Sequence, residues 1–134
     1  MDIPEGDDSQ LFPTEEELPD LLKLFIRAAQ LAFPDLKYSG RLISATAEDC
    51  HLQLLARDAV GHQLPEWTLD IEVYMAGTQR SLMIERQGQL DYPILWQGQY
   101  AVWMDAETGL KVESPAGGEA FEGLARRLMK KLNE

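Results

Sequence analysis

The sequence predicts an α+β fold made of an N-terminal helix, an antiparallel meander of five to six strands and a C-terminal amphipathic helix. Three observations support this prediction. A helix-length apolar segment precedes Pro34, period-two alternation fills residues 38–113, and apolar residues recur at spacings of three and four in residues 119–132. No helix-length pattern interrupts the alternating segment, so consecutive strands are expected to pair in antiparallel fashion.

The first helix is predicted to begin near Leu18 and to end at Phe33. Thr14 and Glu17 have the spacing of a capping box, in which each side chain caps the backbone amide of the other residue. Pro19 fits only in the first turn of a helix, and Pro34 stops it. Apolar side chains cover more than half of the helix circumference, which indicates deep burial.

Strands are predicted at about residues 38–47, 50–57, 67–75, 80–87, 99–104 and 109–113. The clearest strand is 67–75, because every second residue from Trp67 to Met75 is apolar. Apolar residues of the neighbouring strands continue this row, and the whole row is expected to face the core: Cys50, Leu52, Leu54, Trp67, Leu69, Ile71, Val73, Met75, Leu82 and Ile84.

The closing helix is predicted over residues 119–132. Its apolar stripe includes Leu124 and Leu128, which are expected to be core residues. Four cations lie near its C-terminal end, where they suit the helix dipole: Arg126, Arg127, Lys130 and Lys131. We interpret these cations as a solvent-exposed helix face.

Charge divides the chain into a predicted flexible acidic arm, residues 1–13, and a single domain, residues 14–134. The net charge is −11, and residues 1–20 hold eight acidic residues and no Lys or Arg. The remaining residues are therefore close to neutral, and their balance argues against a nucleic-acid partner. The N-terminus does not resemble a secretory signal, and no apolar run is long enough to span a membrane, so a cytoplasmic location is expected.

No pattern in the sequence indicates catalysis, a metal site or a cofactor. The chain contains one cysteine, Cys50, and two histidines, His51 and His62, which is too few for a zinc site of ordinary composition. Cys50 alternates with Leu52 and Leu54, so it is expected to be a buried core residue. Asp70 and Glu72 share a strand face, and we interpret that face as solvated rather than catalytic.

The strand face opposite the core row carries unexpectedly large apolar residues. Leu55, Tyr74 and Met83 fall on it, and Trp103 is expected to join them. Two explanations stay open for this face: a helix covers it within the chain, or it is an exposed surface for a partner.

The leading hypothesis is a non-enzymatic protein-interaction module, such as an adaptor, an assembly chaperone or an inhibitor. The order of elements is shared in outline with small secretion-type chaperones, although this chain lacks their helix within the sheet, and a shared outline does not carry function. The partner would be a protein, with a basic surface attracted by the acidic arm, or a second copy of the chain. The alternative is a small-molecule site or an enzyme with a pocket between helix and sheet, lined by Tyr92, Trp96, Tyr100 and Trp103. RNA binding through exposed aromatic residues is a third hypothesis, which the acidic balance disfavours.

Overall fold

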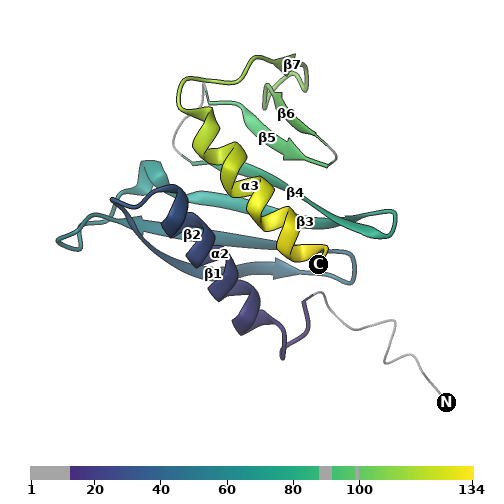
Figure 1. The fold of residues 1–134 in the computed structure, drawn as a ribbon, viewed down its shortest axis with the longest axis horizontal. Helices are drawn as coiled ribbons and strands as arrows, with labels where there is room; N and C mark the ends of the chain where they lie inside the picture. The colour runs from purple at the N-terminus through teal and green to yellow at the C-terminus, as the bar shows by residue number, and fades with distance from the viewer. Residues whose placement is uncertain (1–12, 88–91, 99) are drawn as a thin grey trace.

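The computed structural model describes residues 13–87, 92–98 and 100–134, which form a sheet and two helices in two layers (Figure 1). The helices are α2 (Leu18–Ala32) and α3 (Gly118–Leu132). The strands are β1 (Lys37–Ala45), β2 (Asp49–Arg57), β3 (Leu69–Ala76), β4 (Gln79–Arg86), β5 (Ile94–Gln97), β6 (Ala101–Met104) and β7 (Lys111–Val112), and a 3-10 turn, η1 (Pro65–Trp67), precedes β3. All neighbouring strands pair antiparallel in the order β1 to β7, so the predicted α+β meander is confirmed, with a seventh strand.

The predicted capping box forms immediately before α2. The Thr14 hydroxyl accepts a hydrogen bond from the Glu17 backbone amide at 3.2 Å, and the Thr14 amide donates to the Glu17 carboxylate at 3.3 Å. The α-helix itself begins at Leu18, with Pro19 in its first turn, where no backbone donor is required. The Thr14 and Glu17 contacts therefore fix the direction in which the chain enters α2.

The core lies between the two helices and one face of the sheet. A continuous cross-strand row runs over five strands through Leu52, Ile71, Ile84, Leu95 and Trp103. The helices contribute buried side chains to the same core, among them Phe25, Ala28 and Ala29 from α2 and Phe121, Leu124 and Leu128 from α3. Burial raises the pKa of the Cys50 thiol to about 12, as expected of the predicted core cysteine.

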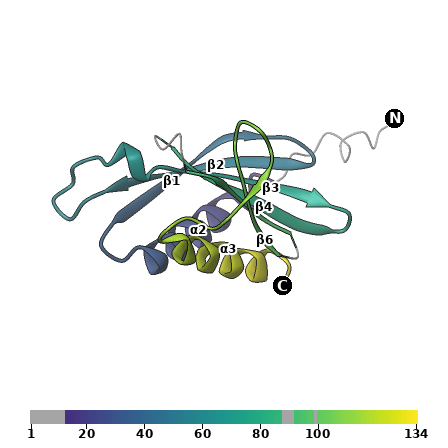
Figure 2. The ribbon, with the colours of Figure 1, turned by 90° about the horizontal axis from the view of Figure 1, so that it is seen from above.

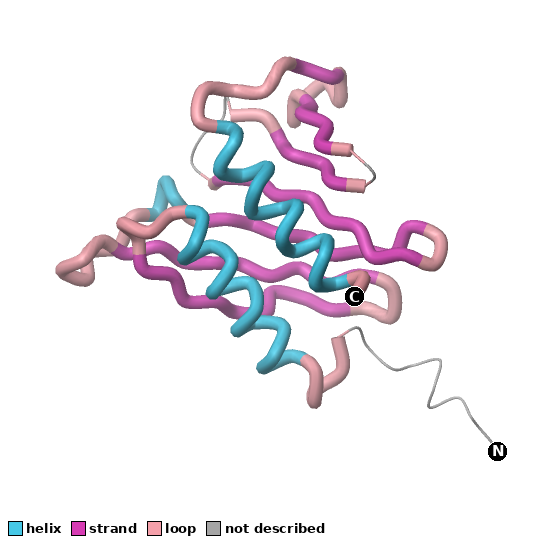
Figure 3. Tube along the Cα trace, viewed as in Figure 1, coloured by secondary structure: helices cyan, strands magenta, loops and turns pink. Residues whose placement is uncertain are grey.

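Both helices lie on the same face of the sheet (Figures 2 and 3). They pack side by side, with α2 against β1 and α3 against β4 and β5. The opposite face is not covered by either helix, and we call it the open face. Of the two explanations for its apolar residues, cover by one of the predicted helices is therefore wrong.

The expected position of Trp103 is also wrong. Trp103 pairs with Leu95 on the helix-covered face, and its side chain is only 4% exposed. Its indole nitrogen donates to the Glu122 carboxylate of α3 at 2.7 Å. The error arose because β5 was not predicted, and without β5 the orientation of β6 relative to the rest of the sheet could not be counted.

The predicted acidic arm lies outside the described residues except for Pro13, which is buried. Among the helices that the structure describes, none is both long and apolar enough to cross a membrane.

Candidate functional site

The open face contains a hollow of about 590 Å³, which we call the acidic hollow. It lies over strands β1 to β4, whose alternate side chains point away from the helices. Acidic and polar residues make up most of its lining: Asp49, His51, Gln53, Asp70, Glu72, Glu85, Ser44 and Gln87, with Ile43 and Met83. The hollow therefore combines acidic groups with an apolar surface to which Ile43 and Met83 contribute.

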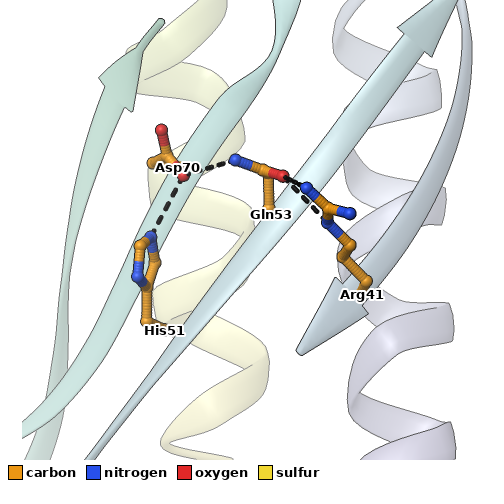
Figure 4. Close-up of polar contacts among 4 residues, drawn as sticks. All are labelled: Arg41, His51, Gln53 and Asp70. Carbon is orange, nitrogen blue, oxygen red and sulfur yellow. Dashed lines mark hydrogen bonds and ion pairs between the residues drawn. The ribbon is translucent and has the colours of Figure 1, made fainter. Parts of the chain in front are cut away.

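A chain of hydrogen bonds crosses three strands at the floor of the acidic hollow (Figure 4). Arg41 on β1 donates to the Gln53 side-chain oxygen from Nε at 2.9 Å and from Nη2 at 2.5 Å. The Gln53 amide nitrogen donates to Asp70 Oδ1 at 3.1 Å, and His51 Nε2 lies 3.1 Å from the same oxygen. The register Arg41–Gln53–Asp70 places these residues directly opposite one another, so the sheet itself aligns the contacts.

The surroundings of Glu72, a carboxyl group of the acidic hollow, shift its pKa. Glu72 pairs across the strands with His51 and lies beside Asp49. Burial raises the pKa of Glu72, and the charge of Asp49 and a hydrogen bond between the two carboxyl groups raise it further, while His51 opposes the shift. The protonated form of Glu72 is therefore favoured more than it is in a free glutamate.

Beside the acidic hollow lies a group of half-buried apolar side chains, which we call the apolar strip. It consists of Tyr74, Met83, Ile94, Trp96, Val102 and Met104. Met83 pairs with Trp96, and Trp96 pairs with Val102, so the strip crosses β4, β5 and β6. The Tyr74 and Trp96 rings pack edge to face, with their centroids 5.9 Å apart. Met83 belongs to both regions, so the apolar strip and the acidic hollow form one surface.

The structure places the predicted site residues in three different parts of the fold. Tyr74 and Met83 lie in the apolar strip, as expected. Leu55 is on the open face but opposite Ser39 of β1, two strands from Met83 and outside the strip. Trp103 is in the core. The sequence prediction missed Trp96 as a residue of this face; the alternation of Ile94 and Trp96 with Leu95 and Gln97 was the available signal, but it extends over four residues only.

The four aromatic residues proposed to line a pocket between helix and sheet lie in different parts of the fold. Tyr92 and Trp103 meet at 5.9 Å on the helix side, where Tyr92 also contacts Phe121. Trp96 points to the open face, and Tyr100 is 74% exposed. The residues therefore do not line one pocket.

Within residues 13–87, 92–98 and 100–134, no three His, Cys, Asp or Glu side chains are placed to hold a metal ion together. Asp58 and His62, the second histidine, form an exposed loop pair at 3.1 Å.

Comparison with known proteins gives one family match. A family model described as a domain of unknown function (DUF8659) matches residues 22–131, from α2 to the last turns of α3. No curated protein matches the chain. No solved structure matches it either.

Proposed function

The chain belongs to the DUF8659 family of domains of unknown function, and we propose that it is a non-enzymatic protein-interaction module that binds a basic partner surface through its open face. The observation that carries this proposal is the one-sided placement of α2 and α3. It leaves Tyr74, Met83 and Trp96 on a sheet face that neither helix covers. The adaptor, assembly-chaperone and inhibitor roles share this binding mode.

The apolar strip supplies the contact area. Aromatic and Met side chains are enriched in the buried centres of interfaces. The Tyr74 and Trp96 rings hold each other in an edge-to-face contact, so they lose little conformational freedom when a partner covers them. Energetic hot spots in interfaces are most often residues of this kind.

The acidic hollow supplies selectivity by charge. Asp49, Asp70, Glu72 and Glu85 line it, whereas Arg41 is directed to Gln53. A partner that places Lys or Arg side chains in the hollow would neutralise these carboxylates, and complementary charge also accelerates association. The preferred partner is therefore a protein with a basic surface that also carries apolar side chains for the strip. The single buried cysteine suits a reducing compartment, and we propose that the protein acts in the cytoplasm.

Affinity capture from the native host tests this proposal with paired variants. Tyr74→Ala and Met83→Ala should each weaken recovery of the same partner by about 30-fold, the effect of a hot-spot residue worth about 2 kcal/mol. Val60→Ala is the matched control, because Val60 is an apolar loop residue with 77% exposure. Size-exclusion chromatography with light scattering identifies a second copy of the chain as the partner. Equal recovery by Tyr74→Ala, Met83→Ala and the control would refute the proposal.

A second candidate function rests on the acid–base groups of the hollow. A histidine bonded to an aspartate whose side chain is 11% exposed, next to a carboxyl group with a raised pKa, is an arrangement found at catalytic sites. The hollow of about 590 Å³ also falls within the size range of small-molecule sites. A thermal-shift screen of cationic small molecules distinguishes this candidate, since a true ligand should stabilise the wild-type protein and lose its effect in His51→Ala.

A further inference from the structure

The solvent side of α3 carries a basic hollow of about 490 Å³, which we call the basic groove. Arg126, Arg127, Lys130 and Lys131 line it, and all four are exposed. Lys131 lies 3.7 Å from Glu134, but the described part of the chain provides no carboxylate within ion-pair distance of Arg126, Arg127 or Lys130. Gly123 forms one wall, where an added Cβ atom would meet nothing within 4 Å, so the groove is open.

A second hollow, of about 260 Å³, lies at the start of the described chain. Pro13 lines it together with Lys131 and Leu132 of α3. Lys131 therefore borders both hollows, and Pro13, where the described chain begins, lines the second one. Glu17 and Asp20 line the α2 side of the same hollow, and Arg80 of β4 and Lys131 of α3 line its other side, so a negatively charged chain is repelled from α2 and attracted toward Arg80 and Lys131.

The preceding segment has the charge that fits this groove. Residues 1–12 contain four acidic residues, Asp2, Glu5, Asp7 and Asp8, and no Lys or Arg. Twelve residues reach at most about 40 Å when extended. The distance along α3 from Lys131 to Gly123 is only about 12 Å, at 1.5 Å for each residue. The segment is therefore long enough to pass the whole groove.

We propose that residues 1–12 bind in the basic groove of the same chain, with their carboxylates facing Arg126, Arg127 and Lys130. The occupant is thus an acidic segment of this protein, which neutralises the cationic side of α3 and shields it from other polyanions. Covalent attachment at Pro13 keeps the segment at an effective concentration in the millimolar range, so individually weak ion pairs suffice. The contact should be lost at about 1 M salt, where the Debye length falls to about 3 Å. This surface lies on the side of the molecule opposite to the open face, so the inference does not depend on the proposed function.

Paramagnetic relaxation in the full chain tests the proposal. Ser9→Cys leaves all four acidic residues in place, and a thiol-reactive nitroxide attaches there selectively because Cys50 is fully buried. At low salt the backbone amide signals of residues 123–131 should broaden more than those of Lys23 and Arg27 on α2. Broadening should disappear at about 1 M salt, where charges are screened. Equal broadening of both helices, or none, would overturn the proposal.

Charge variants identify the groove as the binding surface. Arg126→Glu, Arg127→Glu and Lys130→Glu together should abolish the broadening, whereas Lys23→Glu, Arg27→Glu and Lys111→Glu together should preserve it. A second set, Asp2→Asn, Glu5→Gln, Asp7→Asn and Asp8→Asn, leaves the described fold unaltered and should abolish the broadening as well. Persistence in either the groove variant or the neutral-segment variant would contradict the proposal. Broadening transferred from a nitroxide-labelled chain to an unlabelled ¹⁵N chain would assign the contact to a second copy and would equally overturn it.

Discussion

Trp103 connects the sheet to α3 through both its ring and its nitrogen. The ring is almost completely buried and meets Tyr92 edge to face, and the indole N–H is bonded to Glu122. A buried Trp contributes more apolar area than most core residues, and its N–H requires an acceptor once water is excluded. The residue therefore stabilises the fold and is not available to a partner.

We expect Trp103→Ala to lower the free energy of unfolding by about 3–5 kcal/mol, because the substitution removes a large buried side chain and leaves a cavity. Glu122→Ala should cost about 1–3 kcal/mol, since it leaves the indole N–H without its acceptor, and Glu122→Gln should cost less because its amide oxygen can still accept. Urea unfolding measures all three values. Trp103→Ala with less than about 1 kcal/mol of loss would contradict this assignment to the core.

Glu72 should make stability depend on pH. Its pKa is raised in the folded state, first by burial and then by Asp49, so the fold holds the proton more tightly than the unfolded chain does. The free energy of unfolding therefore decreases as the pH rises from the pKa of Glu72 in the unfolded chain to its raised pKa in the fold. Above the folded pKa of Glu72, the full loss of stability is present. Glu72→Gln should unfold at a higher urea concentration than wild type at pH 7.5, and the difference should shrink as the pH is lowered toward 5.

Glu107→Gln is the control for that measurement, because Glu107 is exposed in the loop between β6 and β7. A pH-independent difference between Glu72→Gln and wild type would show that the carboxyl group of Glu72 is not the source of the effect.

At the scale of the elements, the pattern of the sequence identified each long segment correctly. The α2 and α3 bounds follow from Thr14, Pro34 and the apolar stripes, and the alternation from Leu69 to Val73 correctly placed the core row of β3. Trp67, expected at the start of that strand, instead ends the 3-10 turn η1, where it packs on Phe33 at 5.6 Å. Pro65 explains the difference, since its fixed φ suits the first position of such a turn.

Short elements and contacts across strands were not predictable in the same way. β5 has four residues, which is too few for a periodic signal, and its absence from the prediction placed Trp103 on the wrong face. The network from Arg41 through Gln53 to Asp70 depends on the strand register, which a single sequence specifies only through its apolar pattern. The face of Tyr74 and Met83 was predictable because both lie in long alternating strands; the acidic hollow beside them was not.

Replacing two glycines with alanine should have opposite effects on the stability of the protein. An added Cβ at Gly40 of β1 would lie 3.0 Å from a Leu54 methyl group and 3.2 Å from a Leu22 methyl group of α2. Gly40→Ala should therefore destabilise the protein by about 1–3 kcal/mol through overpacking between α2 and the sheet. Gly123→Ala has open space around it inside α3, so it should stabilise the protein by about 0.5–1 kcal/mol. Thermal unfolding checks both signs, and a Gly40→Ala variant as stable as wild type would show that α2 is not closely packed on β1.

For the whole molecule, the arrangement is a single sheet with cover on one side only. All strand pairings join consecutive segments of the chain, and α2 and α3 meet each other across the same face. The first and last elements are therefore neighbours, with Pro13 beside Leu132. One face of the sheet supplies the core, and the other supplies the surface that we propose for binding.

This proximity of the first and last elements predicts tolerance to circular permutation. A permutant that joins Glu134 to Met1 and opens the chain between Gly77 and Thr78, in the exposed turn between β3 and β4, should retain the fold. Opening the chain between Leu54 and Leu55 should prevent folding, because it breaks β2 where Leu54 pairs with both neighbouring strands. Circular dichroism and the dispersion of ¹H–¹⁵N signals compare the two, and a disordered permutant opened at Gly77 would contradict the prediction.

During translation, the elements of this fold are synthesised in a fixed order. The ribosome makes α2 and then the strands, so the two-stranded unit of β1 and β2 can already pack on α2 while β4 and β5 are being added. The part of the sheet that α3 covers, including Leu82, Ile84 and Leu95, stays bare until residues 118–132 have been synthesised. Phe121, Leu124 and Leu128 all belong to α3, so this part of the core is completed only when α3 has been made. The nascent chain is therefore most prone to aggregation just before α3 emerges from the ribosome. A stalled or truncated product that ends near Pro115 should be recognised by chaperones that bind apolar surface.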